Sequence, residues 1–88
     1  MKIKGEYSIR EIAGETVVVP VGETVIKSNI LAVLNETGRF FWEMLAKGST
    51  EEEIISAMCE EYDVDAETVR SDLSEFVNYL RNNSVEVE

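Results

Sequence analysis

The sequence predicts an α+β fold in which a three-stranded antiparallel sheet is followed by three helices. Three observations predict it: short β-branched and apolar runs precede residue 35, apolar residues recur at helical spacing after it, and each predicted helix begins at a capping residue. The chain has 88 residues, which is the size of one small domain. We therefore expect residues 1–88 to form a single domain.

Three segments in the first part of the chain are typical of strands. Residues 7–12 alternate imperfectly between apolar and polar side chains, and residues 16–19 are β-branched throughout. Between them, Gly14 can adopt a positive φ at the first central position of a type II′ hairpin turn. Pro20 should end the second strand because it has no N–H to donate. The apolar run 30–34 is the predicted third strand.

Local end signals mark the first two helices. Asn35 is a suitable N-cap for a helix from about residue 36 to 47, and Gly48 can supply the positive φ that ends it. Thr50 and Glu53 have the spacing of a capping box, which predicts the start of a second helix. The second helix should bury three apolar side chains, Ile54, Ile55 and Met58.

The third helix is predicted to begin after a further cap, Asp65. Its apolar residues form a regular stripe at helical spacing, and we expect Phe76 and Leu80 to belong to the core. Beyond this helix, Val85 and Val87 alternate with glutamates, which is compatible with a short final strand. The full stripe is Val69, Leu73, Phe76, Val77 and Leu80.

The chain is strongly acidic, with 18 Asp and Glu residues against 8 Lys and Arg residues and a formal net charge of −10. Such a surface repels phosphate backbones and anionic lipid headgroups. The apolar runs are also far shorter than a membrane span. We therefore expect neither nucleic acid nor a membrane as a partner. The charged residues Lys2 and Lys4 indicate no signal peptide, so a cytoplasmic location is expected.

The residue inventory argues against an enzyme. The chain has no His, which is the usual general base and the commonest metal ligand. Its single cysteine, Cys59, excludes an internal disulfide and a Cys-based zinc site. The acidic residues lack the spacing and the glycine of a calcium-binding loop. We expect no catalysis, no cofactor and no metal.

Seven short motifs occur along the chain in an order and with spacings that resemble a known family. They are residues 10–15 (Arg-Glu-Ile-Ala-Gly-Glu), 18–20 (Val-Val-Pro), 34–38 (Leu-Asn-Glu-Thr-Gly), 42–45 (Trp-Glu-Met-Leu), 48–54 (Gly-Ser-Thr-Glu-Glu-Glu-Ile), 61–64 (Glu-Tyr-Asp-Val) and 72–77 (Asp-Leu-Ser-Glu-Phe-Val). By this ordered set the chain resembles the PqqD family, the pyrroloquinoline-quinone synthesis protein D family. Its domain is also known as the recognition element of ribosomally made, modified peptides.

The resemblance implies a winged helix-turn-helix-like fold and a non-catalytic role. Family members act as peptide chaperones that hold the leader of a precursor peptide for a modifying enzyme, often a radical S-adenosylmethionine enzyme. The alternative is a winged-helix DNA-binding domain or another protein-interaction domain. DNA binding would require several basic residues on the third helix, which offers only Arg70 and Arg81.

For a leader peptide, the expected site lies between the third strand and the third helix. An edge strand can pair with an extended peptide, while apolar residues of the helix receive its side chains and two arginines pair with its carboxylates. Each feature has a structural alternative: a central strand, a core stripe and surface ion pairs. An open strand edge is compatible with a monomer or a weak dimer. The expected peptide-binding residues are Asn29, Ile30, Leu31, Ala32, Val33, Leu34, Val69, Arg70, Leu73, Ser74, Val77 and Arg81.

Overall fold

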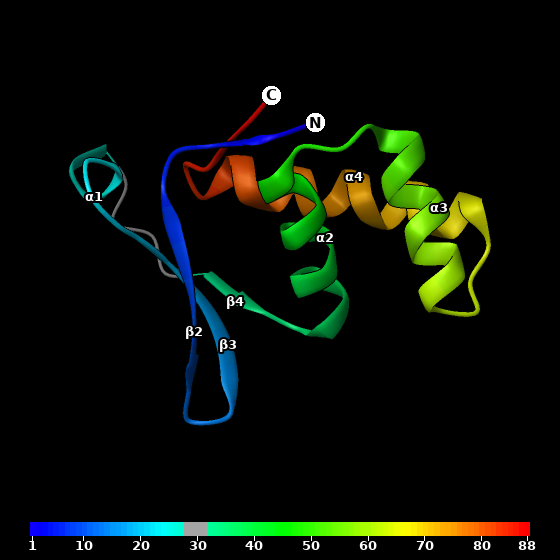
Figure 1. Ribbon diagram of the computed structural model, residues 1–88, viewed down its shortest axis with the longest axis horizontal. Helices are drawn as coiled ribbons and strands as arrows, with labels where there is room; N and C mark the ends of the chain where they lie inside the picture. Colours follow the sequence, from blue (N-terminus) through cyan, green and yellow to red (C-terminus); the bar gives the residue numbers. More distant parts are fainter. Residues whose placement is uncertain (28–31) are drawn as a thin grey trace.

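The computed structural model describes residues 1–27 and 32–88 (Figure 1). The predicted order of a three-stranded antiparallel sheet and three helices is confirmed, and a one-turn helix and a short terminal ribbon are added to it. In chain order the elements are β1 (Ile3–Lys4), β2 (Tyr7–Ile12), β3 (Glu15–Pro20), α1 (Thr24–Lys27), β4 (Ala32–Leu34), α2 (Glu36–Lys47), α3 (Glu51–Glu61), α4 (Ala66–Asn82) and β5 (Glu86–Val87).

A tight hairpin joins β2 and β3 and extends away from the helices (Figure 1). Its two central residues both have positive φ, +52° at Ala13 and +81° at Gly14. The expectation of a type II′ turn with Gly14 in the first central position was therefore wrong. Positive φ at both positions is the pattern of a type I′ turn, whose twist matches that of the flanking strands. The pairing of Ile12 with Glu15 places Gly14 second.

β4 forms one edge of the sheet, which has the order β2-β3-β4. It pairs antiparallel with β3, with Thr16 opposite Leu34 and Val18 opposite Ala32. Alternation along the strand buries Ala32 and Leu34 and leaves Val33 50% exposed. The first part of the expected strand, residues 30 and 31, lies outside the described residues.

α2 is held by local bonds at both ends. The Asn35 side chain accepts a hydrogen bond from the backbone N–H of Gly38 at 2.8 Å, and Gly48 ends the helix with φ +83°. Phe41, Trp42 and Leu45 are buried, and Trp42 lies edge-on to Tyr7 of β2 with ring centroids 5.3 Å apart. This contact fixes the helix against the sheet. Of the three consecutive aromatic residues, Phe40 is half-buried and contacts Tyr62.

α3 and α4 begin at the caps that the sequence indicates. Thr50 and Glu53 form a complete capping box, with N···O distances of 2.8 and 3.1 Å. The Asp65 carboxylate accepts the backbone N–H of Thr68 at 2.8 Å. The core between the helices includes Ile54, Ile55 and Met58 of α3, as expected, and Val69, Leu73, Val77 and Leu80 of α4.

One member of the α4 stripe differs from expectation. Phe76 was expected to be buried with Leu80, but it is only half-buried and lies at the border of the core. Successive helix residues are rotated by about 100°. Once Leu73, Val77 and Leu80 face the core, Phe76 therefore lies at the edge of the buried stripe.

The two ends of the chain lie side by side (Figure 1). The expected final strand is present as β5, but it pairs with β1 and not with the three-stranded sheet. Backbone bonds between Lys2 and Glu88, at 3.0 and 2.8 Å, extend this ribbon. Within the described ranges, no helix is long and apolar enough to cross a membrane.

Two capping carboxylates make the stability depend on pH. The pKa of Glu53 lies below its ordinary value of 4.5 because the carboxylate accepts the Thr50 backbone N–H. The pKa of Asp65 lies below its ordinary value of 3.8 because its carboxylate accepts the backbone N–H of Thr68. A lowered folded-state pKa stabilises the protein above the unfolded-state pKa, and this stabilisation is lost as the pH falls through the folded-state pKa. We expect the free energy of unfolding to decrease below about pH 4.5.

Urea unfolding at several pH values checks this expectation with a matched pair of variants. Glu53→Gln with Asp65→Asn keeps both caps, because the amide oxygens still accept, but removes their titration. This double variant should lose less stability on acidification than wild type. Glu60→Gln with Glu61→Gln removes two carboxylates outside the caps and is the control. If the two double variants lost equal stability on acidification, the two caps would not be the source of the pH dependence.

Candidate functional site

The open edge of β4 borders a groove whose other wall is α4. Two adjoining hollows form this groove and share Asn35, Gly38, Phe76 and Tyr79. Within the described part of the chain, no strand pairs with the edge of β4 that faces away from β3. A free strand edge beside an apolar hollow is the arrangement that takes an extended peptide. The remaining lining residues are Val33, Leu34, Thr37, Phe41, Asp72 and Glu75.

Three aromatic rings run from the core to the surface along the groove. Phe41 of α2 is buried and lies 5.6 Å from Phe76, measured between ring centroids. The ring centroid of Phe76 lies 6.4 Å from that of Tyr79, a residue that is 42% exposed. Large rigid rings with exposed faces provide binding area at low entropic cost. The groove therefore has a preformed apolar floor.

Gly38 lies where α2 begins and leaves little room for a side chain. A Cβ at this position would lie 3.0 Å from the Asn35 side-chain oxygen and 3.4 Å from the Phe76 ring. A larger residue would therefore displace either the helix cap or the aromatic floor of the groove. This close approach explains why the corner after β4 ends in glycine.

The structure brings only part of the expected β4 segment to the groove. Val33 and Leu34 line it, whereas Ala32 is 1% exposed and belongs to the core. Three further expected positions, Asn29, Ile30 and Leu31, lie outside the described residues. Peptide binding along this strand stays a prediction.

The apolar residues of α4 that were expected to receive a peptide lie in the core. Val69, Leu73 and Val77 are 1%, 1% and 3% exposed, so they form core contacts and offer no surface in the free protein. The expectation that they line an open cleft is corrected: Phe76 and Tyr79, on the adjacent face of α4, line it instead. The physical reason is that α4 packs against α3, α2 and β5, which buries the stripe. Ser74 is exposed but is not among the residues that line the groove.

Neither expected arginine lies in the groove. Arg70 forms ion pairs with Glu51 and Glu52 at the start of α3, at 3.1 and 3.5 Å. Arg81 donates from Nη2 to the carbonyl oxygen of Val87 at 3.0 Å and thereby ties β5 to α4. In this structure both arginines have structural partners, so the expectation that they face a bound leader is not supported by their positions.

The sequence contained a signal for the groove residues of α4 that were not among the expected binding residues. Asp72, Glu75, Phe76 and Tyr79 follow the spacing i, i+3, i+4 and i+7, which places them on one face of a helix. That face adjoins the buried stripe. An exposed aromatic residue such as Tyr79 beside a core stripe was the available indication of a binding surface.

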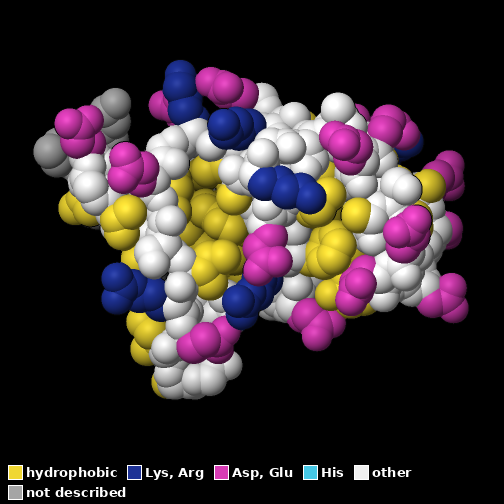
Figure 2. All heavy atoms as spheres, viewed as in Figure 1, with side chains coloured by type: hydrophobic (Ala, Val, Ile, Leu, Met, Phe, Trp, Pro, Cys, Tyr) yellow, Lys and Arg dark blue, Asp and Glu magenta, His cyan; other side chains and the backbone are white. Residues whose placement is uncertain are grey.

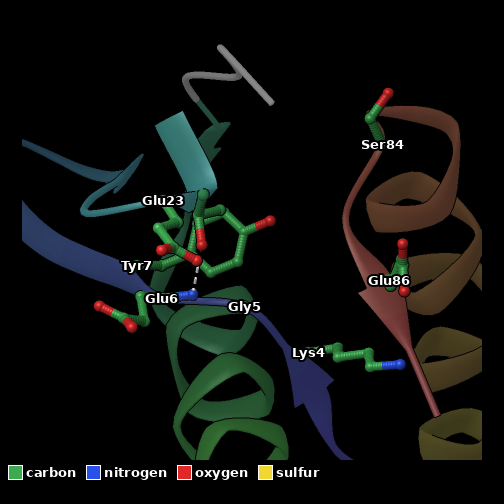
Figure 3. Close-up of a pocket in the computed structure, with 8 residues that line it drawn as sticks. Lys4, Gly5, Glu6, Tyr7, Glu23, Ser84 and Glu86 are labelled. Atoms are coloured by element: carbon green, nitrogen blue, oxygen red, sulfur yellow. Dashed lines mark hydrogen bonds between the residues drawn. The ribbon is translucent and has the colours of Figure 1, made fainter. Parts of the chain in front are cut away.

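A second hollow lies between the start of β2, α1 and the segment that follows α4 (Figure 3). Tyr7 and Glu23 lie on one side of it, and Ser84 and Glu86 lie across from them. A hydrogen bond of 2.7 Å from the Glu6 N–H to the Thr24 hydroxyl closes one wall. This hollow is lined by charges of both signs and lies away from the β4 edge, so the groove beside β4 is the stronger candidate.

The face drawn in Figure 2 shows hydrophobic side chains in the depression between the sheet and α2, and acidic side chains spread over the α3 side. A separate hollow is lined by residues that include Ile3, Tyr7 and Trp42. Across residues 1–27 and 32–88, no group of three or more His, Cys, Asp or Glu side chains is placed to hold a metal ion.

The fold is a small α+β domain in which, among the described residues, an unpaired edge of β4 lies beside an apolar groove. The family model of coenzyme PQQ synthesis protein D (PqqD) matches residues 15–85, and the chain belongs to this family. The family expected from the sequence motifs is thus confirmed.

Two solved structures are similar over nearly the whole chain. TbiB1 in complex with the TbiA(beta) leader peptide is 32% identical, with 98% of this chain and 95% of that chain covered and a TM-score of 0.75. Lasso peptide synthetase B1 complexed with the leader peptide is 18% identical, covers 99% of this chain and 96% of that chain, and also has a TM-score of 0.75. The second likeness concerns the fold alone. No match was found among curated proteins.

Proposed function

We propose that this protein binds the leader of a ribosomally made precursor peptide in extended form beside β4. The observation that supports this most directly is that, among the described residues, one edge of β4 is unpaired and lies beside an apolar groove. TbiB1, a relative at 32% identity, is solved with a leader peptide, which supports the same class of ligand. Backbone bonds to the strand edge would set the register, and pockets for alternate side chains would give specificity.

The protein then presents the bound leader to a separate modifying enzyme, and it has no catalytic role of its own. The sequence contains no His, and the groove needs only binding groups for this task. A radical S-adenosylmethionine enzyme is the partner that the family resemblance favours. The cytoplasm is the proposed location, because the precursor is made by ribosomes there.

DNA binding receives less support. The arginines of α4 are engaged with Glu51, Glu52 and the Val87 carbonyl, and the net charge of −10 opposes a phosphate backbone. No observation in the described structure favours this alternative over a peptide ligand.

Amide shift mapping tests the proposed site. Labelled protein is titrated with synthetic leader peptides, beginning with the TbiA(beta) leader that is bound to the 32% identical TbiB1. We expect the largest changes at 32–34 and at 75–79, because these segments form the two walls of the groove. A labelled DNA duplex at low salt should produce no such pattern. Changes that cluster on α3 and spare β4 and α4 would show that the proposed site is wrong.

A further inference from the structure

The charge of the groove is the opposite of the one expected from the arginines of α4. Asp72 and Glu75 are exposed and line the hollow that contains Phe76 and Tyr79. Among the residues that the structure describes, no Lys or Arg lines either hollow of the groove. None of the ion pairs found in those residues involves Asp72 or Glu75. The apolar floor is therefore bordered by uncompensated negative charge.

We propose that the leader recognised here carries a Lys or Arg beside an apolar anchor; this inference rests on the proposed function. The anchor packs on Phe76 and Tyr79, and the cation lies against Asp72 and Glu75. The apolar contact provides most of the affinity, and the charge pair selects among leaders that share an anchor.

The spacing of the two subsites predicts the spacing within the peptide. Asp72 and Phe76 are four residues apart on α4, which corresponds to a rise of about 6 Å. An extended peptide has side chains on the same face at intervals of about 6.6 Å. A peptide that lies along α4 would therefore place its cation two positions from its anchor.

Both carboxylates are exposed, so the charge pair should be weak and sensitive to salt. Replacing Asp72 with Asn and Glu75 with Gln should weaken the binding of a basic peptide roughly threefold to tenfold at low salt and less at high salt. The same replacements should leave the apolar contact in place.

The test uses a library of random linear peptides selected against the intact chain and two charge variants. The double variant Asp72→Lys with Glu75→Lys reverses the charge at the border of the groove. Glu60→Lys with Glu61→Lys makes the same change on α3 and is the control, since each double variant changes the net charge from −10 to −6 by converting two carboxylates to two ammonium groups. Circular dichroism melting confirms that all three proteins fold. Selected peptides are then mapped by amide shifts.

We expect peptides selected on wild type and on the α3 control to carry Lys or Arg two positions from an apolar residue. Peptides selected on the reversed groove should carry Asp or Glu there. Groove-binding peptides with no preference for a cation, or an equal change of preference in both variants, would overturn this inference alone. A library that yields no binders, or only binders whose shifts spare Val33 and Tyr79, would overturn the proposed function as well.

Discussion

Replacing Tyr79 with Ala will weaken binding of the leader by about 1 kcal/mol, because only the part of Tyr79 that is exposed in the free protein remains to be buried by the peptide. Tyr79 is 42% exposed in the free protein, and its ring forms the outer end of the aromatic floor of the groove. Aromatic residues of this kind carry much of the energy at interfaces. Because Tyr79 is partly exposed and packs at the border of the core, its removal should lower the free energy of unfolding by less than the loss of a fully buried side chain does.

Calorimetric titration of the leader into wild type and the variant gives the difference in binding free energy. Val64→Ala is the matched control, since Val64 is 40% exposed but does not line the groove. We expect the control to bind as wild type does. Equal affinity of Tyr79→Ala and wild type for the leader would exclude Tyr79 as an anchor.

Replacing Leu73 with Ala will lower the free energy of unfolding by about 2–5 kcal/mol, because it leaves a cavity at a fully buried position. Leu73 is 1% exposed and lies in the core cluster together with Leu45 and Leu80. Small domains are stable by about 5–15 kcal/mol in total, so this change removes a large fraction of the stability. Urea unfolding followed by circular dichroism measures it.

The neighbouring Ser74→Ala is the control, because Ser74 is exposed and its change should stay within about 0.5 kcal/mol. Leu73→Asp should abolish leader binding only because it unfolds the domain. If Leu73→Ala unfolds at the same urea concentration as wild type but binds the leader more weakly, then Leu73 is a pocket residue and its place in the core is not what matters.

The helix starts were predictable because each depends on residues close together in the chain. Asn35, Thr50 and Asp65 each accept a backbone N–H three residues further on, so the sequence alone contains both partners of every cap. The strands 7–12 and 15–20 follow similarly from β-branched composition and a two-residue turn. The family could also be identified this way, since its motifs are short and ordered.

The turn type and the terminal ribbon were less accessible. Ala13 adopts φ +52° because the twist of the paired strands requires it, and an isolated Ala-Gly pair does not reveal that choice. The pairing of β1 with β5 joins the two ends of the chain, so no local pattern could indicate it.

The binding groove was decided by tertiary structure. On α4, Val69, Leu73 and Val77 lie on one face, and Asp72 and Tyr79 lie on another. Both faces have regular helical spacing, so periodicity alone could not show which one is buried. Packing against α3, α2 and β5 buries the first set, which leaves the second beside β4.

The partners of the arginines were decided in the same way. The ion pairs of Arg70 with Glu51 and Glu52 span 19 and 18 residues, and they form because α3 and α4 pack together. The sequence by itself thus determined where each helix begins and which family the chain belongs to, because local bonds and short motifs specify both. Only the tertiary structure decided which face of α4 meets the edge of β4 and which charge it carries there, because both depend on contacts between residues far apart in the chain.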